Sequence, residues 1–127
     1  MPVIHGIGTD IVAVARMAEF FRRHGECSLE KTLAPAEREA CRASPDPGRF
    51  LAKRFAAKEA LGKAFGTGVR APVLLPDIAV EHDQLGKPSF AYSPALAAHF
   101  AERGLSAHLS ISDEQDYAVA FVVLEKP

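Results

Sequence analysis

Residues 54–68 read RFAAKEALGKAFGTG, and this stretch decides how the rest of the chain is interpreted. Its leucine and its second phenylalanine stand four residues apart, which places them on one face of a helix. The run Gly66-Thr67-Gly68 then ends the pattern, because glycine readily adopts the backbone conformation in which helices commonly stop. The stretch therefore predicts the second half of a helix that covers residues 48–65 and closes in a glycine turn.

Two carboxylates stand on separate rigid elements of the predicted fold. Glu59 lies on the helix, one turn before Lys63 and on the same face, with Gly62 beside them leaving room for a ligand near the backbone. Asp10 lies in a mostly apolar stretch, residues 3–14, that reads as a buried strand. Proteins usually bind Mg²⁺ through one or two carboxylates together with phosphate oxygens of the ligand. The pattern therefore suggests a magnesium site at Asp10 and Glu59.

Three cations of the helix would neutralise phosphate charge around this site: Arg54, Lys58 and Lys63. Two plainer interpretations remain open at this point. Glu59 and Lys63 have the spacing of an ordinary i,i+4 salt bridge on a helix surface. Asp10 would, in the second interpretation, simply cap a turn.

Helical and strand patterns are mixed along the rest of the chain. Apolar periodicity, N-terminal prolines and terminal glycines predict helices over 16–25, 35–43, 48–65 and 94–103. Strands are predicted over 3–14, 77–82, 88–92, 107–112 and 117–125, and the last two would form an antiparallel hairpin. This mixture indicates an α+β fold, and a chain of 127 residues has the length of a single domain, residues 1–127.

The formal net charge of −1 conceals an uneven distribution. Residues 1–70 carry 12 Lys and Arg against 8 Asp and Glu, whereas residues 71–127 carry 3 against 8. The basic half contains the motif, which favours an anionic ligand or an acidic partner there, although a solvated helix surface would have the same composition. Nucleic acid is not an expected partner, because the net charge is slightly negative and aromatic and basic residues do not interleave.

The sequence also bears on the cellular compartment of the protein and on other enzyme classes. No stretch approaches the ~20 apolar residues of a membrane span, and the first residues lack the basic and apolar regions of a signal peptide. Cys27 and Cys41 lack the spacing of a redox or zinc motif and are interpreted as free thiols. We therefore expect a cytoplasmic protein without a membrane partner. The motifs of serine hydrolases and P-loop nucleotidases are absent.

Several motifs together resemble one known family. The stretch 54–68 is similar to the signature of the holo-acyl-carrier-protein synthases, the small 4′-phosphopantetheinyl transferases. So are GIGTDI at 6–11 with Arg16 six residues after Asp10, GKP at 86–88, HLSIS at 108–112 and YA at 117–118. The resemblance covers essentially the whole chain, and it implies a long helix packed on a curved antiparallel sheet.

The resemblance implies a reaction. These enzymes bind coenzyme A with Mg²⁺ and transfer its 4′-phosphopantetheine arm to a serine of apo acyl carrier protein in fatty acid biosynthesis. The by-product is adenosine 3′,5′-bisphosphate. By resemblance, Asp10 and Glu59 hold the metal, which bridges the pyrophosphate, and Lys63 contacts the phosphates and assists proton transfer. The resemblance also implies that a metal-bound water, or Glu59 acting near it, accepts the proton of the serine.

Further positions follow from the same resemblance. Arg54 and Lys58 would bind phosphate, and the turn Gly66-Thr67-Gly68 would lie against the nucleotide. A basic edge would dock the acidic recognition helix of the carrier through Arg16, Arg22 and Arg23. The family's small members are typically homotrimers with active sites between subunits, so a homotrimer is expected here.

This chain departs from the family pattern at three positions. Acids that many members or larger relatives carry after the first metal ligand are replaced by Val12 and Ala13, and Asp113 stands where a histidine is common. Alternative hypotheses are therefore a carrier-binding module without turnover and a metal-free nucleotide-binding protein. A transferase that serves polyketide or peptide-synthesis carriers is a further alternative, and Mn²⁺ could replace Mg²⁺.

Overall fold

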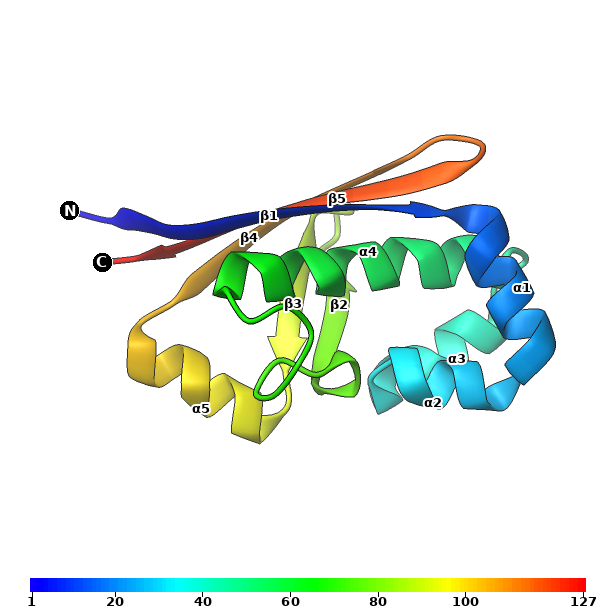
Figure 1. The fold of residues 1–127 in the computed structure, drawn as a ribbon, viewed down its shortest axis with the longest axis horizontal. Coiled ribbons are helices and arrows are strands. Elements are labelled where there is room, and N and C mark those ends of the chain that lie inside the picture. Colours follow the sequence, from blue (N-terminus) through cyan, green and yellow to red (C-terminus); the bar gives the residue numbers. More distant parts are fainter.

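The computed structural model describes residues 1–127 and is built around one long helix, α4 (Pro47–Phe65). This helix lies along one face of a three-stranded antiparallel sheet with the strand order β1-β5-β4 (Figure 1). The strands are β1 (Val3–Ala13), β4 (Ser106–Asp113) and β5 (Tyr117–Lys126). The predicted α+β fold with a long helix on an antiparallel sheet is confirmed.

The remaining elements cover the other sides of α4 (Figure 1). A separate two-stranded antiparallel hairpin is formed by β2 (Ile78–His82) and β3 (Pro88–Tyr92). Three short helices gather near the N-terminal end of α4 and a fourth lies near its C-terminal end. Their bounds are α1 (Val14–His24), α2 (Glu26–Thr32), α3 (Pro35–Ala43) and α5 (Pro94–Arg103), and a single 3₁₀ turn, η1 (Leu75–Asp77), precedes β2.

Two glycines of β1 allow the strand to touch the backbone of α4. A Cβ atom at Gly8 would lie 2.0 Å from the carbonyl oxygen of Ala60, and one at Gly6 would lie 2.0 Å from that of Ala64. Any larger residue at either position would force the strand away from the helix, because both obstacles are backbone atoms. The close approach brings Asp10, two residues after Gly8, to the edge of α4.

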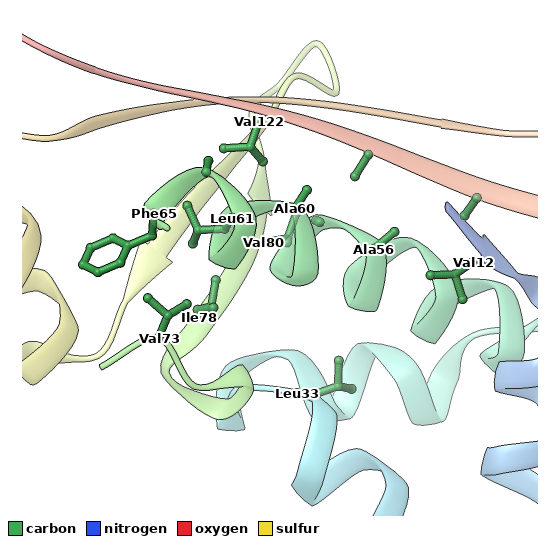
Figure 2. Close-up of a cluster of buried hydrophobic side chains, with 14 of the residues drawn as sticks. Val12, Leu33, Ala56, Ala60, Leu61, Phe65, Val73, Ile78, Val80 and Val122 are labelled. Carbon is green, nitrogen blue, oxygen red and sulfur yellow. The ribbon is translucent and has the colours of Figure 1, made fainter. Parts of the chain in front are cut away.

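The hydrophobic core lies on both sides of α4 (Figure 2). Val12 and Val122 approach the helix from the sheet, whereas Leu33, Val73 and Ile78 approach it from the opposite side. Fully burying a side chain of this size stabilises the fold by about 1.5–3 kcal/mol. Packing on two faces therefore fixes the orientation of α4, and with it the direction of each polar side chain that the helix carries.

Most element boundaries agree with the predictions, and the differences have physical reasons. The helices predicted over 35–43 and 94–103 are found with those bounds. The seven-residue α2 was not predicted, because so short a segment shows no clear period. It follows directly on α1 at Gly25, whose φ of 51° lets the chain turn between the two helices. The pairing of β1 with β5 was not predicted either, because it joins the two ends of the chain.

The outer face of the sheet, turned away from α4, exposes a row of apolar side chains. Ile7 and Ile11 of β1 are 59% and 64% exposed, and Phe121 and Tyr117 of β5 are 46% and 53% exposed. The register places Ile11 opposite Val119, so these side chains form a continuous surface across both strands. Contiguous exposed apolar surface of this kind commonly marks an interface with another protein.

Candidate active site

Asp10 and Lys63 meet where β1 crosses α4. The Lys63 ammonium donates hydrogen bonds to the backbone oxygen of Thr9 at 2.9 Å and to Asp10 Oδ1 at 3.2 Å. The Asp10 side chain is 18% exposed and that of Lys63 is 52% exposed. The ammonium of Lys63 is therefore fixed against β1, while about half of its side chain stays exposed to solvent.

Glu59 lies in the same neighbourhood, and its pKa is raised above the ordinary value. Partial burial is the main cause and the charge of Asp10 adds to it, whereas Lys63 and Arg16 act in the opposite direction. Two carboxylates and two cations thus influence one another at this crossing. Burial and the charge of Asp10 thus disfavour the ionised form of Glu59 relative to a free glutamate, and a further cation bound beside it would oppose this shift.

The two carboxylates fit a magnesium ion that is shared with a ligand. No group of three or more His, Cys, Asp and Glu residues in the structure forms a ready-made metal cage. Mg²⁺ does not require one, since it commonly keeps waters and takes its other oxygens from substrate phosphates. Asp10 and Glu59 offer oxygen ligands alone, which is the donor type that Mg²⁺ prefers.

The plainer interpretation of Glu59 and Lys63 as a surface salt bridge is wrong for this structure. Lys63 makes its ion pair with Asp10 of β1 and not with the glutamate on its own helix. The contact joins residues 53 positions apart in the chain, so it depends on the fold and not on helical spacing. Asp10 lies inside β1, which also removes the interpretation that it caps a turn.

Arg54 lines a different cleft, on the side of α4 near its N-terminal end. This cleft has a volume of about 270 Å³ and contains three cations among its lining residues: Ser44, Pro45, Asp46, Arg49, Phe50, Lys53 and Arg54. The Arg54 guanidinium lies over the Phe50 ring, 4.2 Å from its centre, and its side chain is 12% exposed. Its position suits an anionic group, so the sequence-based role of Arg54 remains a proposal.

Lys58 is not available to a phosphate, in contrast to the sequence-based prediction. Its side chain is fully buried, and its ammonium donates hydrogen bonds to Thr32 O at 2.8 Å, Glu37 Oε1 at 2.6 Å and Leu75 O at 3.3 Å. Burial lowers the pKa of Lys58 to about 8, although the ion pair with Glu37 opposes this shift. All three ammonium protons are donated to acceptors within the protein, so none is left for a phosphate.

The glycine turn after α4 packs against the helix itself. The amides of Gly66 and Gly68 both donate to the carbonyl oxygen of Gly62, at 3.1 and 2.9 Å. A Cβ atom at Gly62 would lie 2.7 Å from the carbonyl carbon of Gly68. The space beside Gly62 is therefore filled by this turn, and the prediction that it leaves room for a ligand is wrong. The Thr67 hydroxyl donates to Gly68 O at 2.8 Å.

A larger pocket adjoins the carboxylates through Arg16. It has a volume of about 420 Å³ and an apolar floor with a mostly basic rim, lined by Arg16, Met17, Glu19, Phe20, Arg23, His24, Lys31, Thr32, Phe55 and Leu75. Two of the three predicted docking cations, Arg16 and Arg23, stand on this rim. The third, Arg22, is highly exposed and pairs with Glu19 at 2.5 Å. It does not line the pocket.

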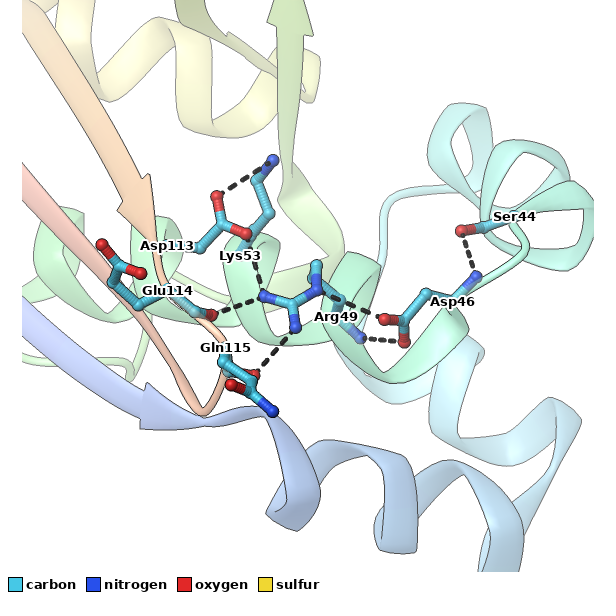
Figure 3. A network of polar contacts seen from close by, with 7 residues as sticks. All are labelled: Ser44, Asp46, Arg49, Lys53, Asp113, Glu114 and Gln115. Atoms are coloured by element: carbon cyan, nitrogen blue, oxygen red, sulfur yellow. Dashed lines mark hydrogen bonds and ion pairs between the residues drawn. The ribbon is translucent and has the colours of Figure 1, made fainter.

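Sequence reasoning missed two residues around these sites. Lys31 joins the rim of the pocket from α2, the helix that was not predicted. Arg49 was also missed, although it holds the tip of the β4–β5 hairpin against the start of α4 (Figure 3). It pairs with Asp113 at 2.9 Å and donates to the carbonyl oxygens of Glu114 and Gln115 at 2.7 and 2.9 Å. The only available signal was Asp113 itself, at a position where a histidine was expected.

Comparison with known proteins now identifies the family. The family model described as 4′-phosphopantetheinyl transferase superfamily matches residues 6–122. The chain belongs to this superfamily. A holo-[acyl-carrier-protein] synthase from Azoarcus sp. (strain BH72) is 59% identical over 123 residues, which is 97% of this chain and 98% of the relative.

Solved structures of the superfamily agree with the fold. The crystal structure of a holo-[acyl-carrier-protein] synthase from Neisseria meningitidis superposes with a TM-score of 0.93 at 46% identity, covering 98% of this chain and all of that one. The synthase from Bacillus anthracis, solved in complex with CoA (3′,5′-ADP), gives 0.81 at 36% identity and covers 98% of both chains. The sequence-based family assignment is therefore confirmed.

Proposed function

We propose that this protein transfers the 4′-phosphopantetheine arm of coenzyme A to a serine of apo acyl carrier protein. The observation that carries this proposal is the ion pair of Lys63 with Asp10 where β1 crosses α4, near enough to Glu59 for the charge of Asp10 to raise the pKa of that carboxyl. That site adjoins a basic-rimmed apolar pocket through Arg16. Relatives that match nearly the whole chain are named holo-[acyl-carrier-protein] synthase, and this supports the same reaction here.

Asp10 and Glu59 would hold Mg²⁺ at this site. When bound, the ion supplies electrostatic stabilisation of the pyrophosphate as negative charge develops on it. The carboxylates fix its position on two rigid elements, a strand and a helix, so little reorganisation is needed during the reaction. The all-oxygen donor pair does not distinguish Mg²⁺ from Mn²⁺.

Lys63 would stabilise the charge of the transferred phosphoryl group. In the reaction, the serine oxygen of the carrier forms a bond to the phosphorus that carries pantetheine. The bond from that phosphorus to the bridging oxygen breaks and adenosine 3′,5′-bisphosphate leaves with the electron pair. The serine proton would pass to the Glu59 carboxylate or to a water beside it. Lys63 is already anchored by Thr9 O and Asp10 and is half exposed, so it can face the phosphates without losing its position.

The rest of coenzyme A would contact two other regions. Arg54 supplies positive charge for a phosphate group in its cleft, where the neighbouring Arg49 and Lys53 are already paired with Asp113. The turn Gly66-Thr67-Gly68 is rigid, because both glycine amides bond to Gly62, and it would lie against the nucleotide.

The pocket beside Arg16 would dock the carrier. Its cations Arg16, Arg23 and Lys31 suit the acidic recognition helix of a carrier, and its apolar floor, which includes Phe20 and Phe55, would accept an apolar side chain. Charge attraction at an exposed rim is weak and sensitive to salt. Such docking suits an enzyme that must release the carrier after one transfer.

The exposed apolar face of the sheet would bury itself in a homotrimer with active sites between subunits. A cavity of about 300 Å³ on this face is lined by Ile7, Gly8, Thr9, Lys63 and Phe121. Lys63 therefore connects the apolar face with the Asp10 site, and a neighbouring subunit seated there would also enclose the reacting groups. Equilibrium sedimentation should give three times the mass of the chain, and a monomer would rule out the trimer.

The cellular setting follows from this function. Both cysteines are free and no helix is long and apolar enough to cross a bilayer. We expect residues 1–127 to act as one transferase domain in the cytoplasm, in fatty acid biosynthesis. Rates on several apo-carriers would separate this role from service to polyketide or peptide-synthesis carriers.

The function is tested by incubating the protein with coenzyme A, Mg²⁺ and apo acyl carrier protein, and by weighing the carrier by intact mass spectrometry. A gain of one phosphopantetheine that EDTA prevents is the expected result. If several apo-carriers bind but gain no mass while coenzyme A also binds, the protein is a carrier-binding module and the proposal is wrong.

A further inference from the structure

Glu37 of α3 is the centre of a buried charge network that the proposed reaction does not use directly. Its Oε1 accepts hydrogen bonds from Ala34 N at 2.9 Å and from Lys58 Nζ at 2.6 Å. Its Oε2 accepts from Val80 N at 2.9 Å and lies 2.9 Å from Arg54 Nε, an ion pair whose N–H is not aligned for a hydrogen bond. Glu37 is only 4% exposed and Lys58 is fully buried.

The network joins five separate segments of the chain. Glu37 connects α3 with β2 through Val80 and with α4 through Lys58. Lys58 extends it to the end of α2 at Thr32 and to η1 at Leu75. These contacts fix the side of α4 that faces α2, α3 and η1.

A role in stability alone does not explain why the network contains charges. Removing two charges from water is so unfavourable that apolar residues of similar size often stabilise a fold equally well or better. The network also has two cations, Lys58 and Arg54, for one carboxylate, Glu37. A buried cluster with surplus positive charge is costly, and it becomes useful when an anion binds at its open end.

The open end of the network is Arg54. Its Nε faces Glu37. Its two terminal nitrogens make no hydrogen bond to the protein, and they are not fully buried. The guanidinium also lies over the Phe50 ring and lines the basic cleft. The inner edge of Arg54 is thus fixed and its outer edge is left for a ligand.

We propose that Glu37 and Lys58 are positioning residues that fix the Arg54 guanidinium for an anionic group of coenzyme A. Lys58 acts through Glu37, which it holds in place by a 2.6 Å contact, and does not touch the substrate. This inference rests on the proposed function, because it takes coenzyme A as the ligand of the cleft.

A double-mutant cycle tests the proposal by equilibrium binding of coenzyme A, without carrier and without turnover. The dissociation constant is measured calorimetrically for wild type, Lys58→Met, Arg54→Ala and the double variant. We expect Lys58→Met to weaken binding several-fold and Arg54→Ala to weaken it more. The double variant should be no weaker than Arg54→Ala alone, because Lys58 acts only through Arg54. Lys126→Met, an exposed lysine at the end of β5, is the matched charge control.

Two results would overturn the proposal. Additive losses in the double variant would mean that Lys58 contributes to binding independently of Arg54. An unchanged dissociation constant together with a lower melting temperature would mean that the network is only structural. Glu37→Gln, which keeps the side-chain shape, is measured in the same cycle with Arg54→Ala, so the result does not depend on Lys58→Met folding.

Steady-state kinetics separate this inference from the proposed function. In an active wild type, Lys58→Met should raise the KM for coenzyme A and leave the KM for the carrier unchanged, which loss of folded protein would not do. If wild type binds coenzyme A but transfers nothing, the proposed function fails while the binding cycle still decides the role of Lys58.

Discussion

Lys58 and Glu59 are neighbours in the sequence, yet they lie in opposite kinds of environment. Lys58 faces α2, α3 and η1, where it is fully buried and its ammonium is saturated by Thr32, Glu37 and Leu75. Glu59 faces the crossing with β1, where partial burial and the charge of Asp10 both raise the pKa of its carboxyl. Consecutive residues of an α-helix point about 100° apart. The packing on each side of α4 therefore decides which charge serves the fold and which is left for a ligand.

The contrast between the two sides of α4 predicts that the side facing β1 contains the residues that catalyse the reaction. Glu59→Gln should reduce kcat at least about 100-fold, because it removes one of two carboxylates that would hold the metal. The melting temperature should stay the same or rise, because the ionised Glu59 is unfavourable where it lies. Steady-state assays and thermal unfolding measure both effects.

Glu102→Gln is the matched control for that variant, since Glu102 is an exposed glutamate of α5 and far from the site in sequence. It should retain wild-type kcat. Full activity of Glu59→Gln would instead remove Glu59 from the mechanism and break the comparison.

Lys63 sharpens the comparison, because it is a lysine that the fold leaves half exposed. Lys63→Ala should lower kcat by roughly 10- to 100-fold, since it removes the cation that pairs with Asp10 and that, in the proposed reaction, would face the phosphates. Its melting temperature should change little, in contrast to that of a variant at buried Lys58. An unchanged kcat would reduce Lys63 to a structural contact with β1.

A smaller effect is expected at the proposed docking pocket, where two arginines of α1 form a matched pair. Arg16 lines the pocket, whereas Arg22 is exposed and paired with Glu19. Arg16→Ala should raise the KM for the carrier several-fold, and less so at high salt, while Arg22→Ala should have a weaker effect. Equal effects of both variants would mean that the pocket is not the docking site. An equal rise in the KM for coenzyme A would also argue against it.

The reactivity of the two cysteines reports on the buried side of α4 without any substitution in the chain. Cys41 is fully buried near Arg54 and Glu37, and burial raises the pKa of its thiol to about 11, whereas Cys27 is exposed. At neutral pH an alkylating reagent should label Cys27 quickly and Cys41 only on unfolding. Mass spectrometry after proteolysis would show this order. Equal labelling of both residues in the folded protein would show that the buried side opens readily.

Much of the fold was predictable from local patterns in the sequence. Proline and serine at the start of α5 and glycines after α1, α4 and α5 mark helix ends by their backbone preferences, and those ends were found. The β1–β5 pairing and the short α2 were not predictable, because the first depends on contacts across the whole chain and the second is too short to show a period.

The site was predictable only in part. The family signature indicated Asp10, Glu59 and Lys63, and the structure pairs Lys63 with Asp10 and places Glu59 within reach of both charges. The signature also treated Lys58 as a ligand-binding cation. Nothing local distinguishes Lys58 from Lys63, since the buried partner of Lys58 is Glu37, 21 positions earlier in the chain. The partner of a charge, and with it the role of that charge, is set by tertiary packing.

The most direct test of the account is calorimetric titration of Mg²⁺ into the protein saturated with coenzyme A. The account predicts that wild type and Glu102→Gln bind the ion equally well, and that Asp10→Asn and Glu59→Gln bind it at least about tenfold more weakly. Wild-type Mg²⁺ affinity in Glu59→Gln would contradict the claim that the crossing of β1 and α4 is the metal-dependent catalytic centre.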